Sequence, residues 1–183
     1  TFFVCGATTN GLISTHLIPA AHDHGITQVT AASLLALIGV FDIFGTLGSG
    51  WLTDRYDARY LLLVYYGLRG LSLMALPLAF GTEHAALLAF AVVYGLDWVA
   101  TVPPTSALTT HAFGLQRAGV VFAWIFAAHQ LGAAIAAWGA GLIRDWPGDY
   151  APAFVGFGAA AVVAAGAVLL ITVRHRPEPM TVG

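Results

Sequence analysis

Long apolar segments constrain this chain more than any other feature of its sequence. A helix needs roughly 20 apolar residues to cross a bilayer core about 30 Å thick. Six segments of this kind follow one another, separated by short polar or Gly/Pro-rich stretches. They cover about residues 1–21, 28–51, 60–80, 84–104, 118–141 and 151–173. We therefore predict an all-α membrane protein, with a bundle of six transmembrane helices over residues 1–173 and a polar tail at 174–183.

The composition excludes most other classes of protein. Only 9% of the residues are charged, against about 25% in a typical soluble domain. A soluble helical bundle needs polar outer faces, which these segments lack, and the alternating pattern of a membrane β-barrel is absent. The net charge is −2 and there is no lysine, so no basic cluster is available to bind nucleic acid. The bilayer is thus the first expected partner.

The placement of arginine predicts the orientation of the bundle. One side of the six spans holds five arginines and the other holds only Arg144. The five are Arg55, Arg59, Arg117, Arg174 and Arg176. Because short cytoplasmic loops are enriched in arginine and lysine, we place the side with five arginines, and with it the C-terminus, in the cytoplasm. We predict a multi-pass protein of the cell (inner) membrane. The chain starts with Thr1 inside an apolar run, so we interpret it as a fragment.

Four polar residues fall near the middle of predicted spans: Asp42, Arg69, Asp97 and His129. A charge at the bilayer centre costs at least ~2.5–3.5 kcal/mol, so such residues face the protein interior and pair. We expect Asp42 to pair with Arg69, with Asp97 as the alternative partner. One carboxylate then lacks a cation and could take up a proton, as a proton-coupled carrier requires. The alternative is a purely structural ion pair formed by Arg69.

Other polar residues are candidates for a solute or proton pathway. His129 is followed by Gln130, and this histidine could bind an anion, relay a proton or form a hydrogen bond with another helix. Asn10 and His16 belong to the stretch "TTNGLISTH", which is polar enough to line a watery cavity. Gly6 and Gly11 would allow that first segment to bend.

Two further patterns predict local structure. Pro103 and Pro104 are expected to close or kink the fourth helix, because proline lacks the N–H group that a helix interior uses. Small residues predict where helices approach one another closely. In the second span these are Gly45, Gly48 and Gly50, and in the fifth they are Gly132, Ala133, Ala136, Ala137, Gly139 and Gly141.

No cofactor or enzymatic chemistry is predicted. The sequence "HDH" at residues 22–24 suggests a metal, but no third or fourth ligand follows at a suitable spacing, so we favour a solvated loop. The chain has no GxSxG, HExxH or CxxC motif and no phosphate-binding glycine loop with lysine. We therefore predict that the protein binds no metal and is not an enzyme.

The polar stretches resemble a known family. "GWLTDRYDAR" at residues 50–59 is similar to a loop motif of the major facilitator superfamily, and Gly50, Asp54, Arg55 and Arg59 match it. Asp57 stands where the family usually has glycine. "PPTSALTTHAFGLQRAG" resembles the family's loop between helices ten and eleven, and "HQLGAAIAAWGAGLIRDWPGDYAPAF" resembles the end of helix eleven and the start of helix twelve. The resemblance implies the last six helices of a twelve-helix fold.

Within that superfamily the chain is most similar to monocarboxylate-transporter-like and oxalate/formate-antiporter-like carriers. Asp42 stands where animal monocarboxylate carriers have an aspartate in helix eight, but Thr46 replaces the arginine that they carry one turn later. The resemblance implies that the third and sixth spans are peripheral and that the other four face a central cavity. It also implies that Asp54 and the loop arginines form a charge network between helix ends.

The function implied is that of a secondary active symporter or antiporter. It would move a small organic solute, such as a monocarboxylate anion, by alternating access and with proton coupling. The partners implied are the lipid bilayer, the solute and an N-terminal six-helix half. The alternative is a non-transporting membrane sensor or assembly subunit built on the same fold.

Overall fold

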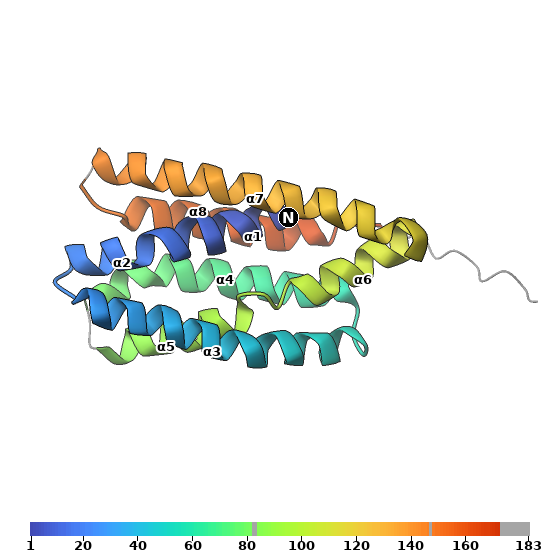
Figure 1. Cartoon of the computed structure of the whole chain (residues 1–183), viewed down its shortest axis with the longest axis horizontal. Coiled ribbons are helices and arrows are strands. Elements are labelled where there is room, and N and C mark those ends of the chain that lie inside the picture. Colours follow the sequence, from blue (N-terminus) through green and yellow to red (C-terminus); the bar gives the residue numbers. More distant parts are fainter. Residues whose placement is uncertain (82–83, 147, 173–183) are drawn as a thin grey trace, which may run out of the picture.

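The structure, a computed structural model, describes residues 1–81, 84–146 and 148–172 as an elongated bundle of helices (Figure 1). The described residues contain helices and turns but no strand, which confirms the predicted all-α class. The first elements are α1 (Phe2–Gly6), the π-helix η1 (Ala7–Ile13), α2 (Ser14–Asp23), α3 (Gln28–Thr53) and α4 (Ala58–Phe80). They are followed by α5 (His84–Asp97), α6 (Val102–Phe113), α7 (Leu115–Asp145) and α8 (Ala151–Val168).

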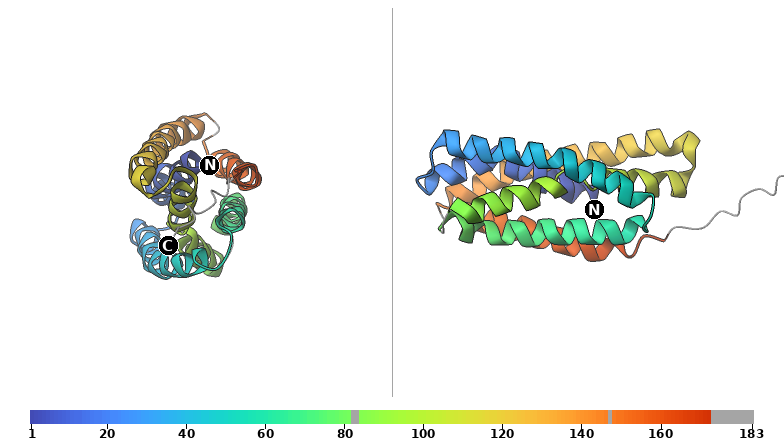
Figure 2. Two further views of the ribbon diagram at one scale, coloured as in Figure 1. Left: turned by 90° about the vertical axis from the view of Figure 1, so that its right-hand side faces the viewer. Right: turned by 90° about the horizontal axis from the view of Figure 1, so that it is seen from below.

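In the part of the chain that the structure describes, five helical segments are long and apolar enough to cross a membrane. They are Gln28–Thr53, Ala58–Phe80, Ala85–Phe113, Leu115–Asp145 and Ala151–Val168. The remaining predicted span, residues 1–21, is formed by α1, η1 and α2 end to end rather than by one continuous α-helix. Seen along its axis, the bundle has α7 and α8 on one side and α3 and α5 on the other (Figure 2). The predicted tail at 174–183 lies outside the described residues.

The fourth predicted span differs from the expectation at its proline pair. The predicted helix ended at Pro104, but α5 already ends at Asp97, and a four-residue turn at 98–101 follows. Pro103 and Pro104 then lie in the first turn of α6, where a missing N–H group costs little. Their rings would clash with the carbonyl groups four residues earlier, so the helix must be interrupted before them. The stretch after the prolines, which the sequence predicted as a loop, is therefore helical as far as Phe113.

Glycines bring three pairs of helices into close contact. A side chain on Gly45 of α3 would overlap the backbone of Leu96, and one on Gly132 of α7 would overlap that of Phe3. Gly70 of α4 and Gly158 of α8 likewise face each other's backbones. The contacts predicted for Gly45 and Gly132 are thus confirmed. Gly48, Gly50 and Gly139 make no such contact within the described residues, because a side chain there would meet none of their atoms within 4 Å.

Candidate functional site

A buried ion pair occupies the middle of the bundle. Arg69 lies midway along α4, and its Nε donates to Oδ2 of Asp97, the last residue of α5, at 2.6 Å. The two side chains are 0% and 4% exposed. The predicted pairing of Arg69 with Asp42 was therefore wrong, and the alternative partner, Asp97, is the one the structure shows. Helices α4 and α5 pack against each other, which brings these two residues together.

Both terminal nitrogens of Arg69 also donate hydrogen bonds. One terminal nitrogen donates to Sγ of Cys5 in α1 at 2.8 Å. The other donates to the backbone carbonyls of Asp97 and Trp98, at 2.6 and 3.1 Å. In contrast, Oδ1 of Asp97 is buried and has no hydrogen-bond partner among the described residues. All three guanidinium nitrogens thus donate, in four hydrogen bonds, while one carboxylate oxygen beside them is free to accept.

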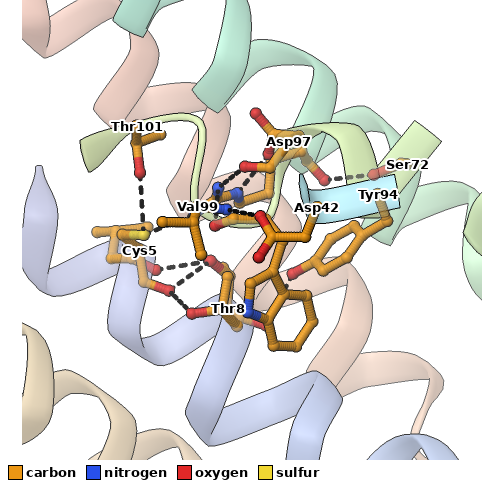
Figure 3. Close-up of polar contacts among 12 residues, drawn as sticks. Cys5, Thr8, Asp42, Ser72, Tyr94, Asp97, Val99 and Thr101 are labelled. Carbon is orange, nitrogen blue, oxygen red and sulfur yellow. Dashed lines mark hydrogen bonds and ion pairs between the residues drawn. The ribbon is translucent and has the colours of Figure 1, made fainter. Parts of the chain in front are cut away.

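Asp42 binds a backbone N–H group and not Arg69, which was its predicted partner. Its Oδ1 accepts a hydrogen bond from the backbone N–H of Val99 at 2.9 Å, inside the turn that separates α5 from α6 (Figure 3). The same oxygen accepts from the hydroxyl of Thr46, one turn along α3, at 3.1 Å. Thr46, which stands where the similar carriers have an arginine, therefore orients the carboxylate. Asp42 is half-buried against the turn.

Other side chains also hold this turn. Oγ of Ser49 in α3 donates to the carbonyl of Ala100 at 2.5 Å. Sγ of Cys5 lies 3.3 Å from Oγ1 of Thr101, the residue that precedes α6 (Figure 3). The N–H of Val102 donates to the carbonyl of Val99 at 2.9 Å. Side chains from α1, α3 and α4 therefore converge on residues 97–101, which we call the α5–α6 break.

His129 lies next to this cluster, on α7. Its ring is buried and stacks on Phe126, with centroids 5.3 Å apart, and it also contacts Phe2. Nδ1 lies 3.2 Å from Oε1 of Gln130, and Cys5 is an electrostatic neighbour of the ring. Gln130 itself is exposed in this half. His129 is thus connected to Arg69 through Cys5.

The first segment contains the π-helix η1 where the sequence predicted a bend. Wider helical turns of this kind are rare in proteins overall, but those that occur often lie at functional sites. The carbonyl of Thr8 accepts a hydrogen bond from the hydroxyl of Tyr94 at 2.8 Å (Figure 3), which connects η1 to α5. Asn10 of η1 is exposed, and its carbonyl accepts from the hydroxyl of Thr15 at 3.1 Å. Asn10 therefore presents an exposed amide side chain at the surface of this half, with no hydrogen-bond partner for that amide among the described residues.

His16 lies apart from the ion pair. Its Nε2 is 2.8 Å from the carbonyl of Ala137, and its Nδ1 is 3.2 Å from the hydroxyl of Tyr150. Because a carbonyl can only accept, Nε2 carries the proton and Nδ1 accepts from Tyr150. The imidazole thus connects α2, α7 and the start of α8. Near this end of the bundle, Asp23 from the "HDH" stretch forms two hydrogen bonds with Arg144, both at 2.9 Å.

The loop motif at the other end of α3 also has a defined geometry. The carboxylate of Asp57 caps α4 through the N–H of Arg59 at 2.9 Å and pairs with the Arg59 guanidinium at 2.6 Å. This hydrogen bonding lowers the pKa of Asp57 from its usual value. Arg59 also donates to the carbonyl of Ile171, beyond α8, at 3.4 Å. Asp57, which departs from the family motif, is therefore the carboxylate that pairs.

Arg55 and Asp54, the two other charged residues of the motif, take no part in this ion pair. Arg55 packs over the ring of Trp51, 4.0 Å from its centroid, and donates to the Trp51 carbonyl at 3.0 Å. Within the described ranges, the side chain of Asp54 forms no ion pair or hydrogen bond. The predicted network between Asp54 and the arginines is therefore not formed in this half alone.

Sequence reasoning missed several residues of the cluster. Cys5, which binds Arg69, was not predicted to do so, and neither Ser49 nor Thr101 was predicted to hold the α5–α6 break. Thr101 had a detectable signal, since a threonine directly before a helix-starting proline region is a typical cap position. Ser49 and Cys5 carry no such signal, because each acts on a group distant in sequence.

Comparisons with known proteins show which family the sequence matches. The sequence profile of the Major Facilitator Superfamily matches residues 1–182. The chain is 30% identical over 152 residues to the Uncharacterized MFS-type transporter YcxA of Bacillus subtilis (strain 168), covering 81% of this chain and 36% of the relative. It is 30% identical over 162 residues to Monocarboxylate transporter 13 of Rattus norvegicus, covering 87% of this chain and 37% of the relative. It is 32% identical over 148 residues to Monocarboxylate transporter 12 of Xenopus laevis, with coverages of 76% and 31%. The chain thus spans about a third of the length of these curated relatives.

Proposed function

The chain belongs to the Major Facilitator Superfamily, and we propose that it forms the C-terminal six-helix half of a secondary active transporter. The proposed partner is an N-terminal half of similar size, which fits the fraction of the relatives that this chain matches. Transport would proceed by alternating access, as the two halves rock around a site near the middle of the membrane. The proposed location is a cell membrane, with the C-terminus in the cytoplasm.

The proposed solute is a small organic anion of the monocarboxylate class. Two of the relatives described above are named monocarboxylate transporters, which supports this class. Asn10 and Gln130 are exposed polar side chains on η1 and α7, so they are the proposed contacts for the solute. His129 lies directly behind Gln130 and could add a positive charge for a carboxylate when protonated.

Asp97 is the proposed proton acceptor, and this assignment carries the proposal for coupling. Its Oδ1 is buried without a hydrogen-bond partner among the described residues, while Oδ2 is held by Arg69. A proton on Oδ1 would neutralise the carboxylate and weaken its attraction to the guanidinium, which is strong in a medium of low dielectric constant. The titratable groups around the pair include Cys5, Tyr65, Tyr66, Tyr94 and His129. Arg69 itself is completely buried, so its proposed role is structural.

The test is solute uptake by the full-length protein in proteoliposomes. We expect labelled lactate or pyruvate to accumulate under an inward proton gradient and to stop accumulating when a protonophore collapses the gradient. Glycerol, which is small and uncharged, and liposomes without protein are the controls. Equal uptake of the monocarboxylates with and without protein would contradict the transport proposal, and uptake indifferent to the protonophore would contradict proton coupling.

A further inference from the structure

The α5–α6 break offers few backbone groups to a solute. At the start of a helix the first N–H groups are normally free and can bind an anion. Here Pro103 and Pro104 have no N–H, and those of Val102 and Thr105 are bonded to the carbonyls of Val99 and Thr101. The break is therefore unlike the broken helices whose free backbone ends bind a solute.

The break is held by side chains from two helices instead. Arg69 of α4 binds the carbonyls of Asp97 and Trp98, whereas Asp42 of α3 binds the N–H of Val99. These contacts replace hydrogen bonds that the interrupted helix loses, and an unsatisfied backbone group in a membrane interior costs several kcal/mol. Asp97 is the residue at which α5 ends, so the geometry of the break sets the position of its carboxylate.

We propose that Asp42 is a positioning residue, which fixes the break and thereby holds the Asp97 carboxylate against Arg69, and that Asp42 does not itself carry a proton. This inference rests on the proposed function of Asp97. The contact that carries it is the 2.9 Å hydrogen bond from the N–H of Val99 to Oδ1 of Asp42. Gly45, three residues further along α3, packs against the backbone of Leu96 and so keeps α3 close to the end of α5.

The two roles make opposite demands on the side chain at position 42. A positioning residue needs only one oxygen that accepts from Val99 and Thr46, and the amide of asparagine supplies such an oxygen. A proton carrier needs a carboxyl group, which asparagine lacks. The conservative variant Asp42→Asn therefore rescues the positioning role but not proton transfer, whereas Asp42→Leu abolishes both.

Hydrogen–deuterium exchange of the full-length protein measures positioning without any transport. In Asp42→Leu the amide of Val99 loses its acceptor, so we expect about tenfold faster exchange in a peptide covering residues 96–102. Asp42→Asn should exchange at the rate of the unchanged protein. Ser33→Ala is the matched control on α3, since within the described ranges the Ser33 hydroxyl bonds only to the carbonyl of Val29 on the same helix.

Uptake as a function of pH is the second readout. We expect Asp42→Asn to retain the dependence of monocarboxylate uptake on the proton gradient and Asp42→Leu to weaken it. The proposal is overturned if Asp42→Asn loses the gradient dependence while its exchange at 96–102 is unchanged. It is also overturned if Asp42→Leu exchanges at the unchanged rate. Should Asp42→Leu not fold, Asp42→Asn alone decides. If the full-length protein proves not to transport, the exchange result still tests the positioning of the break.

Discussion

Arg69 and Asp97 form an ion pair in which Nε lies 2.6 Å from Oδ2, at the middle of a bundle of apolar helices. The same guanidinium binds the backbone carbonyl of Asp97, so a single side chain holds both the charge and the helix end that presents it. Because both residues are buried, neither charge can be stabilised by water if its partner is removed. This arrangement leads directly to the first prediction.

Removing Arg69 should destabilise the protein strongly. Arg69→Leu leaves the charge of Asp97 buried and uncompensated, and breaking a buried pair in this way costs about 3–5 kcal/mol. The double variant Arg69→Leu with Asp97→Leu should recover much of that loss, since no charge remains buried. Thermal unfolding of the full-length protein in detergent is the measurement. The control is Arg117→Leu, at an exposed position in the first turn of α7. Equal melting temperatures for Arg69→Leu and Arg117→Leu would contradict the pairing.

Two glycines on α3 provide a matched test of helix packing. A methyl group on Gly45 would overlap the backbone of Leu96, whereas one on Gly48 would meet no atom of the described residues within 4 Å. Gly45→Ala should therefore lower the melting temperature by forcing α3 away from α5. Gly48→Ala should have no effect or a small stabilising one, because alanine is favoured over glycine in a helix by roughly 0.5–1 kcal/mol. A larger loss for Gly48→Ala than for Gly45→Ala would show that the close contact lies elsewhere.

The charge of Asp57 should stabilise the protein in a way that depends on pH. Arg59 lowers the pKa of the Asp57 carboxyl in the folded state. Its contribution is therefore fully present above the unfolded pKa of about 3.9 and is lost as the pH falls through the lower folded value. Asp57→Asn keeps an oxygen for the helix cap but removes the charge.

We expect Asp57→Asn to melt below the unchanged protein at pH 7 and the difference to shrink below about pH 4. Thermal unfolding across this pH range is the measurement, and Asp54→Asn removes a charge from the same loop as a control. A difference that persists unchanged at the lowest pH would show that the ion pair with Arg59 does not stabilise the fold.

The fold was largely predictable because its main signal is apolar length. Spans near α3, α4, α7 and α8 follow from runs of about 20 apolar residues between polar breaks. The proline pair at 103–104 was expected to close or kink the fourth helix, and the helix is indeed interrupted directly before it, at residues 98–101. The start of a new helix at this point was not predicted, since proline at a helix end and proline in the first turn of the next helix look alike in sequence. The two cases differ in whether residues 105–113 form a helix. The moderate polarity of these residues suggested a loop instead.

The sequence was enough to identify several of the residues that belong to the site, but not which of them contact each other. Polar residues in apolar spans identified Arg69, Asp97 and His129, and these do lie together with Cys5 between them. Choosing between Asp42 and Asp97 as the partner of Arg69 required the rotation of each helix about its axis, which counting residues does not provide. The actual partner of Asp42 is a backbone N–H, and that group becomes available only because the helix is broken at Val99.

The central claim, that Asp97 accepts the coupling proton beside Arg69, is tested most directly by Asp97→Asn in the full-length protein. Two activities are compared in proteoliposomes: accumulation of labelled monocarboxylate driven by a proton gradient, and exchange of the same solute at equal pH on both sides. We expect Asp97→Asn to lose gradient-driven accumulation and to retain exchange, because an amide cannot be protonated to carry the proton across. Accumulation by Asp97→Asn equal to that of the unchanged protein would contradict the account.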